Sequence, residues 1–233
     1  MLAMRYMASN PPSQSTGCLG KILRLWIFLF ACGLMAALFF IAKPQDLTDL
    51  GGYGPDAGQR KPRDLKAVMQ ASLRQGHPLA LSEAEINRWL GSTLKTRQGG
   101  ALASHVTLDR VWVRLKDGIA EIIMERHVMG RPFTLSMFVK VEQTRSPAGM
   151  RMIVHRHGGE YHSALPKPMR GGRFGTLVVP QGFLNLVVPA FGNLASHYRE
   201  EIELSIESMA VVRIEKDRLI LQPRPPEGPA PTF

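Results

Sequence analysis

Residues that could bind a metal ion are concentrated in one short stretch, between Gly149 and His162. Within it, His155 and His157 alternate as residues on one face of a β-strand do, and Glu160 follows closely. Imidazole nitrogens together with a carboxylate are ligands that suit zinc, iron or manganese. This stretch is therefore the place in the sequence where the residue types alone would permit metal chemistry.

The stretch is similar to the first metal motif of the cupins, but two features depart from that pattern. Glu160 stands too early, and the turn Pro180-Gln181-Gly182 is followed by apolar residues and an asparagine where a fourth histidine is expected. We therefore interpret the histidines as solvent-facing, and a cupin-like metal-dependent enzyme is the third alternative for function. The sequence predicts neither a bound metal nor another cofactor.

Other catalytic signatures are missing from the sequence. It contains no G-x-S-x-G elbow, no Walker loop, no G-x-G-x-x-G fingerprint and no H-E-x-x-H pair. The glycine-rich run 171–175 lacks the Lys-Ser/Thr pair of a phosphate-binding loop, and we interpret it as a turn. Glu121 and Glu125 share a strand face at a separation of about 13 Å, too far apart to act on one bond, and are expected on a solvated face. The chain is thus predicted not to be an enzyme.

Residues 25–42 (LWIFLFACGLMAALFFIA) form an uncharged apolar stretch near the N-terminus. A helix of this length spans roughly 27 Å, close to the thickness of a bilayer's hydrocarbon core. Basic residues and no acidic residue precede it, whereas Asp46 and Asp49 follow it. By the positive-inside rule, residues 1–24 are cytoplasmic. The sequence therefore predicts a single-pass protein of the inner (cytoplasmic) membrane with an extracytoplasmic C-terminal domain.

Three alternatives to a permanent anchor fit the sequence less well. A cleaved signal peptide would need a shorter apolar core and two small residues before the cleavage point, but Phe40 occupies one of those positions. A lipoprotein would use Cys32, but the bulky Phe30 precedes it and apolar residues continue beyond it. A buried core helix is disfavoured because the stretch is apolar on all sides.

The rest of the chain divides by composition into a linker, a domain and a tail. Residues 43–61 are rich in turn formers and are predicted to be a linker. Residues 62–222 show amphipathic periodicity, and residues 223–233 are a proline-rich tail. Because Cys18 and Cys32 both precede the domain, it must be stabilised by an apolar core and not by disulfides.

The net charge of +10 is spread along the chain and does not form a block. No nucleic-acid-binding motif accompanies it. We therefore predict no nucleic-acid partner, and expect the positive charge to face solvent or the anionic lipids of the membrane.

Hydrophobic periodicity changes along the domain. Helical spacing from Pro62 to Gly76 and again from Ser82, with Glu85 at capping-box spacing, predicts two amphipathic helices. Beyond Gly100, alternation with a period of two predicts antiparallel strands, then an apolar helix and a last hairpin. These later elements are expected at 111–116, 119–128, 133–142, 150–157, 181–198 and 209–222. The predicted fold class is α+β: an N-terminal transmembrane helix and then a curved antiparallel sheet covered on one face by helices.

The helix expected at 181–198 is more apolar than contact with a sheet on one side requires. It is either a core helix or the wall of an apolar groove that would accept an acyl chain. In the second case the candidate ligand-binding residues are Phe183, Leu186 and Phe191. Asn87, which lies beside the buried stripe of an earlier helix, would need hydrogen-bond partners if enclosed, and is predicted to have a structural role.

An N-terminal anchor, LSEAEINRWL opening a helix, VRLKDGIAEI in a meander, and GGRFGTLVVP before an apolar helix occur here in that order. This arrangement resembles the anchored bacterial proteins of the YpmS and YceB type, which are similar to tubular lipid-binding (TULIP-like) domains. The similarity covers about residues 78–222 and is most specific at the motif L-S-E-x-E-I-N-x-x-L that begins at Leu81. It implies an extracytoplasmic domain that binds or hands on a lipid-like ligand, with the bilayer and envelope proteins as partners. The alternative is an interaction or scaffold domain of an envelope complex.

Overall fold

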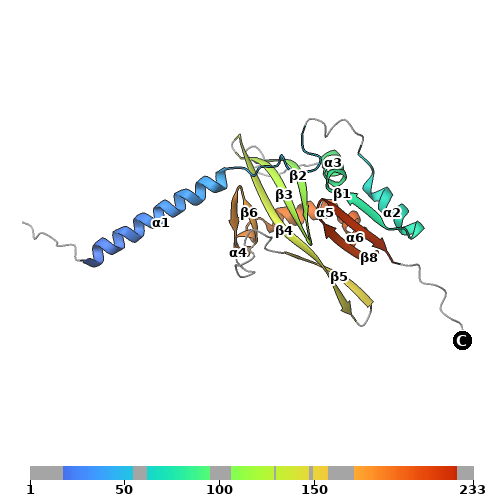
Figure 1. Cartoon of the computed structure of the whole chain (residues 1–233). Helices are drawn as coiled ribbons and strands as arrows, with labels where there is room; N and C mark the ends of the chain where they lie inside the picture. Colours follow the sequence, from blue (N-terminus) through green and yellow to red (C-terminus); the bar gives the residue numbers. More distant parts are fainter. Residues whose placement is uncertain are drawn as a thin grey trace, which may run out of the picture. The chain divides into compact units, whose positions relative to one another are not determined.

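The structure is a computed structural model that describes residues 18–54, 62–94, 106–128, 130–146, 149–156 and 171–224. They form two units, one ending at Phe39 and one beginning at Phe40 (Figure 1). Each unit is described by itself below.

The helix α1, Cys18–Ala42, makes up the described part of the N-terminal unit, and its last three residues belong to the second unit. Its part Gly20–Ala42 is long and apolar enough to cross a membrane, and none of it is buried inside the protein. Large side chains such as Trp26 and Phe30 are exposed along it. The structure thus confirms one N-terminal helix of spanning length, which includes the expected segment 25–42 and begins a few residues before it.

The second unit begins with two short helices at the positions that their caps predict. In α2, Leu65–Gln75, the side chain of Asp64 accepts the N–H of Ala67, and Gly76 ends the helix at a φ of 68°. In α3, Glu83–Thr93, the predicted capping box is present. Both helices direct their apolar residues toward the strands described next.

Six antiparallel strands form the larger sheet, in the order β2-β3-β4-β6-β7, with β5 also paired to β4. β4 is long enough to pair with β6 at residues 135–137 and with β5 at residues 139–146, along the same edge. The run 171–175, predicted as a turn, is β6 followed by a turn at Gly175. The strand bounds are β2 Val106–Lys116, β3 Ile119–Val128, β4 Arg131–Ser146, β5 Gly149–Arg156, β6 Gly172–Phe174 and β7 Leu177–Val179.

The smaller sheet has three antiparallel strands in the order β1-β9-β8. Its hairpin turn meets the β2–β3 turn of the larger sheet, where Gly118 N–H donates to Ile214 O at 2.9 Å and Asp217 N–H donates to Leu115 O at 3.2 Å. The two sheets are thereby joined through their turns. The strand bounds are β1 Leu79–Ser82, β8 Met209–Glu215 and β9 Arg218–Pro223.

The apolar helix predicted at 181–198 is divided into α4, Gln181–Leu184, and α5, Val188–His197. A further helix, α6, Arg199–Ile206, follows directly. The break between α4 and α5 falls at residues 185–187. Pro189 lies in the first turn of α5, where its missing N–H costs no intrahelical hydrogen bond.

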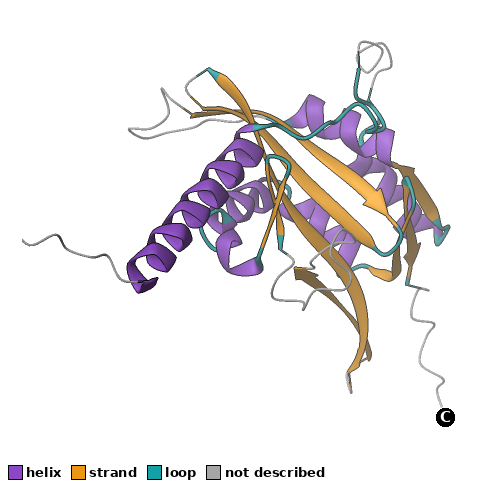
Figure 2. Ribbon diagram, turned by 60° about the vertical axis from the view of Figure 1, so that its left-hand side comes forward, coloured by secondary structure: helices purple, strands orange, loops and turns teal. Residues whose placement is uncertain are grey.

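The main core lies between one face of the strands and the helices, and Figure 2 shows these helices behind the strands. This arrangement confirms the α+β fold class, with helices on one face of an antiparallel sheet. The buried apolar residues of this core come from α2, α3, α5 and both sheets, and are Leu65, Met69, Leu81, Trp89, Leu90, Val111, Met124, Leu135, Phe191, Met209 and Leu221.

The opposite face of the larger sheet is covered by residues 43–54, which we call the post-α1 segment. Leu47 and Leu50 of this segment are buried against Trp112 and Ile123. In Figure 2 the segment crosses in front of the strands as a loop. The linker expected at 43–61 therefore differs from the structure in its first part, because leucines in a glycine-rich stretch supply an apolar contact; residues 55–61 lie outside the described residues.

Candidate functional site

Two polar side chains of α3 hold the edge of β2. Asn87 is 1% exposed, and its Oδ1 accepts the N–H of Val113 at 2.7 Å. Its Nδ2 donates to Val113 O and to Gly51 O, both at 2.9 Å. The side chain thus satisfies an edge strand's backbone groups, as a neighbouring strand would. This confirms the structural role predicted for Asn87.

Glu83 lies one helical turn before Asn87 and binds the backbone in the same way. Its Oε1 accepts the N–H of Gly51 at 2.7 Å, and its Oε2 accepts the N–H of Leu115 at 2.6 Å. Burial raises the pKa of Glu83, while these two N–H donors oppose the shift. We call Glu83 and Asn87 the α3 clamp, because together they bind both the N–H and the C=O of Gly51.

Gly51 is required at the clamp by its close approach to α3. A Cβ at this position would lie 2.9 Å from the backbone nitrogen of Ala84, a distance at which the backbone would have to shift. The neighbouring Gly52 has a φ of 83°, which a side chain disfavours. The glycines of the post-α1 segment are thus explained by close packing and by turn geometry.

A buried ion pair fastens the same segment further along. Arg114 and Glu121 face each other across β2 and β3, and Arg114 Nη1 donates to Glu121 Oε2 at 2.9 Å. Arg114 Nη2 donates to the backbone oxygen of Asp46 at 3.0 Å and to Asp49 Oδ1 at 2.8 Å. The guanidinium therefore links two strands to the post-α1 segment.

The solvated face expected for Glu121 is wrong, because this residue is 2% exposed. Its second oxygen, Oε1, accepts the hydroxyl of Ser136 at 2.7 Å and lies 3.4 Å from Arg173 Nε. Burial disfavours the charged form of Arg114, but the carboxylates of Glu121 and Asp49 outweigh it and raise the pKa of Arg114. We call Asp49, Arg114, Glu121 and Ser136 the Arg114 network; its charges are paired, which suits a structural role.

The β6–β7 turn caps the C-terminal end of α1 within the second unit. Thr176 N–H donates to Phe40 O and to Lys43 O, both at 3.0 Å, and Thr176 Oγ1 donates to Phe40 O at 3.0 Å. Gly175 has a φ of 55°, and a Cβ there would lie 2.3 Å from Ile41 O. Carbonyl groups that a helix end leaves unpaired are thereby satisfied.

The structure does not bring the three predicted ligand-binding residues together. Phe191 is 5% exposed and belongs to the main core. Phe183 and Leu186, on α4 and in the loop after it, are 55% and 77% exposed. These two are the most exposed large apolar side chains among the described residues that follow α1.

Six partly buried apolar side chains of β4, β6, α5 and the loop before α5 adjoin the main core. They pack against the buried residues but keep some solvent contact, as the wall of an apolar binding site does. We call this set the apolar face: Phe133, Met137, Phe174, Val187, Ala190 and Leu194.

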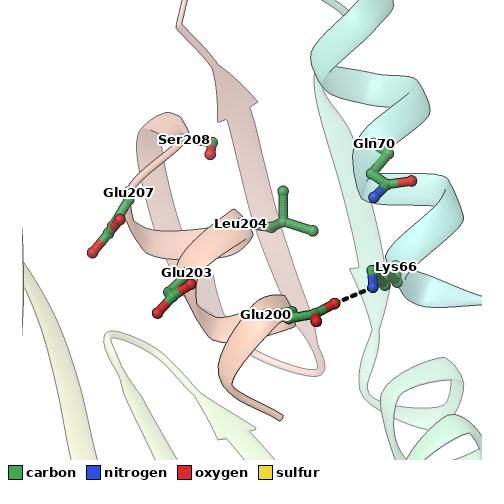
Figure 3. A pocket seen from close by; sticks show the side chains of 7 residues that line it. All are labelled: Lys66, Gln70, Glu200, Glu203, Leu204, Glu207 and Ser208. Carbon is green, nitrogen blue, oxygen red and sulfur yellow. Dashed lines mark hydrogen bonds and ion pairs between the residues drawn. The ribbon is translucent and has the colours of Figure 1, made fainter.

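A cavity of about 380 Å³ lies between α2 and α6 (Figure 3). Its wall carries Glu200 and Glu203 of α6 and Glu207, which caps that helix, and Glu200 accepts a hydrogen bond from Lys66 of α2. Since this ion pair is exposed, its contribution to stability is small. The lining is polar and acidic, unlike an acyl-chain site, and comprises Lys66, Gln70, Glu200, Glu203, Leu204, Glu207 and Ser208.

Within the described ranges, no group of three or more His, Cys, Asp or Glu side chains is placed to hold a metal ion. His155 belongs to β5, whereas His157, Glu160 and His162 lie outside the described residues. The interpretation of this stretch as solvent-facing histidines stays a prediction.

Sequence reasoning missed the α3 clamp residue Glu83 and the Arg114 network, although both left a signal. Glu83 and Asn87 are four residues apart and share a helix face. Arg114 and Glu121 lie symmetrically about the two-residue Asp-Gly hairpin turn, which makes them direct cross-strand partners.

Comparison of the chain with known proteins gives no match to a protein-family model, to a curated protein or to a solved structure.

Proposed function

We propose that this chain is a single-pass protein of the inner membrane whose extracytoplasmic α+β domain binds or hands on a lipid-like apolar ligand and catalyses no reaction. Support for the anchor comes from α1, which has spanning length and exposed apolar side chains. Support for the orientation comes from the basic residues before α1 and the acidic residues soon after it. The resemblance to TULIP-like domains, carried by the motif around Asn87, agrees with this proposal.

The apolar face is the observation that carries the ligand proposal. Its six side chains come from two strands, from α5 and from the loop before it; each packs against the main core and is only partly buried. Covering such a surface with an acyl chain gains about 0.8 kcal/mol for each methylene group removed from water. Leu186 directly precedes Val187 of this face, and Phe191 packs beneath it in the core.

The test is lipid analysis of the full chain extracted from membranes in detergent. We expect a lipid-like molecule to copurify, and Met137→Asn on the apolar face to lower the amount bound per mole of protein. Ile202→Asn is the matched control, since Ile202 is an exposed apolar residue of α6 outside the apolar face. Thermal unfolding of each variant separates loss of ligand from loss of fold. A wild-type chain that carries no lipid contradicts the proposal.

A second candidate is a scaffold domain of an envelope complex, which the fastening of the post-α1 segment favours. The α3 clamp and the Arg114 network hold residues 46–51 against the sheet, so the segment that directly follows α1 belongs to the folded domain. A domain that begins this soon after a membrane anchor suits a scaffold. Extraction in mild detergent would then yield the chain in a complex larger than its monomer and without bound lipid.

A further inference from the structure

The chain has a second long uncharged stretch, besides the one in α1. No charged residue occurs between Arg173 and His197. This stretch contains the β6–β7 turn, α4 and nearly all of α5. Exposed apolar patches mark sites of contact with a protein or a membrane, and helices that lie in the membrane interface bury Trp, Phe or Leu side chains there.

The stretch begins at the point where α1 ends. Thr176 binds the carbonyl oxygens of Phe40 and Lys43, so the β6–β7 turn lies at the end of the apolar helix. β7 has three residues, and at about 3.3 Å per residue α4 begins roughly 10 Å from that turn. The headgroup layer of a bilayer is about 5 to 8 Å thick on each side. The start of α4 is thus about 10 Å from the turn that binds the end of α1, a distance of the same order as the thickness of this layer.

Leu184 anchors α4 in the domain, while large apolar residues next to it face outward. Leu184 is fully buried, and Gln181 packs so closely on Gly171 that a Cβ there would lie 2.7 Å from the Cα of Gln181. Phe183 and Leu186, on either side of Leu184, are exposed. Two large apolar side chains are thus fixed on the surface of a charge-free segment.

We propose that Phe183 of α4 and Leu186 of the loop after it lie in the headgroup layer of the same bilayer that α1 spans, and so form a second membrane contact of this protein. This inference rests on the membrane span in the proposed function. It deepens that function because Leu186 adjoins Val187 of the apolar face. A membrane-seated α4 would open the apolar face toward the lipids of the outer leaflet, which would then be the source of the ligand.

The experiment uses the full chain reconstituted into phosphatidylcholine vesicles that carry nitroxide-labelled lipids. Three single-cysteine variants are labelled with an environment-sensitive fluorophore. Two of them, Leu186→Cys and Ile202→Cys, also carry Cys18→Ser and Cys32→Ser. The third carries Cys18→Ser alone, so that the label is attached to Cys32 within α1. Leu186 and Ile202 are exposed, so both substitutions are compatible with folding.

We expect the label at position 186 to shift its emission to the blue and to lose fluorescence to nitroxides placed near the headgroups. The label at position 202 should do neither, and the label on Cys32 should lose fluorescence to nitroxides placed deep in the acyl chains. If positions 186 and 202 behave alike while Cys32 is quenched, the second membrane contact is refuted but the span stands. If Cys32 is not quenched, the span fails, and both this inference and the proposed function are overturned.

Discussion

Asn87 and Gly51 are 36 positions apart in the sequence and are joined by a hydrogen bond of 2.9 Å from the side-chain amide of the one to the carbonyl oxygen of the other. The same amide also donates to Val113 O. One buried side chain therefore connects a helix, the edge strand of the larger sheet and the segment that follows α1. Disturbing this residue should disturb all three.

Replacing Asn87 with Leu should strongly destabilise the domain. The variant leaves Val113 N–H, Val113 O and Gly51 O buried without partners, and at about 1 to 3 kcal/mol for each unsatisfied group we expect a loss of roughly 3 kcal/mol or more. Urea unfolding of the full chain in detergent measures this. Asn193→Leu, the same substitution at an exposed position of α5, is the control and should change the stability little. Equal effects of the two substitutions would contradict the clamp.

Glu83 and Glu85 should give the domain opposite pH dependences. Burial raises the pKa of Glu83 above its ordinary value of 4.5, so the Glu83 carboxyl stays protonated in the folded domain at pH values where it is ionised in the unfolded chain. The contribution of Glu83 to the free energy of unfolding therefore falls as pH rises from 4.5 through the pKa of the folded state. The hydrogen bond from the backbone N–H of Ser82 lowers the pKa of Glu85. The contribution of Glu85 to the stability of the domain is therefore present above pH 4.5 and is lost as pH falls through the pKa of the folded state.

The two glutamates are separated by comparing Glu83→Gln with Glu85→Gln. The unfolding free energy is measured for each variant and for the wild type between about pH 3 and 8. Relative to Glu83→Gln, the wild type should become less stable as pH rises; relative to Glu85→Gln, it should become more stable. Differences of the same sign for both would show that the raised pKa of Glu83 is wrong.

Leu47→Ala and Leu50→Ala should each destabilise the domain by about 2 to 5 kcal/mol, because each removes a buried side chain from the contact with Trp112 and Ile123. Thr48→Ala, between them and exposed, should have a much smaller effect. The measurement is the thermal midpoint of the full chain in detergent. A flexible linker would leave all three midpoints unchanged.

Arg114→Met should cost about 3 to 5 kcal/mol, because it leaves the carboxylate of Glu121 buried without its main partner. Adding Glu121→Gln removes that charge and keeps an acceptor for Ser136, so the double variant should recover part of the loss. A double-mutant cycle on the unfolding free energy measures this coupling. Strictly additive losses would mean that the two residues do not interact.

Protease added to intact spheroplasts should digest the chain beyond Lys43, since the charges around α1 favour a cytoplasmic N-terminus. Detection of the N-terminus and of the C-terminal domain with separate tags shows which part is cut. Protection of the C-terminal domain would reverse the orientation.

Local signals in the sequence were sufficient for most of the individual elements. The capping box at Ser82, the stop at Gly76 and the Asp-Gly turn at 117–118 each describe a conformation fixed by neighbouring residues, and the structure has all three. The same holds for α1, whose length and composition alone define it as a candidate span.

The covering of the second face of the sheet could not be predicted in this way. Alternation along β2 places Trp112 and Arg114 on the side of the strand opposite Val111 and Val113, which face the main core, and a polar residue in such a pattern normally indicates solvent. Arg114 is buried nonetheless, because two carboxylates pair with it. Glu121 comes from the next strand, and Asp49 comes from a segment far away in the sequence. Pairing across that distance is not encoded in local periodicity.

The environments of the predicted ligand-binding residues could not be predicted from local periodicity either. The sequence alone does not distinguish the environments of Phe183, Leu186 and Phe191. In the structure Phe183 and Leu186 are exposed to solvent, whereas Phe191 is buried in the core. The break at 185–187 decides this, and a helix break changes the face of every residue beyond it.

The two-sided burial of the larger sheet also constrains the order in which the chain is synthesised and folded. Leu47 and Leu50 leave the ribosome before Trp112 and Ile123, which bury them, and at normal rates of elongation the delay is on the order of seconds. During that time these leucines have no partner strand, and they follow directly after an apolar helix. The strands β2 and β3 must then assemble against the post-α1 segment, which already follows α1. One face of the sheet can therefore be covered by this segment while the sheet is still forming.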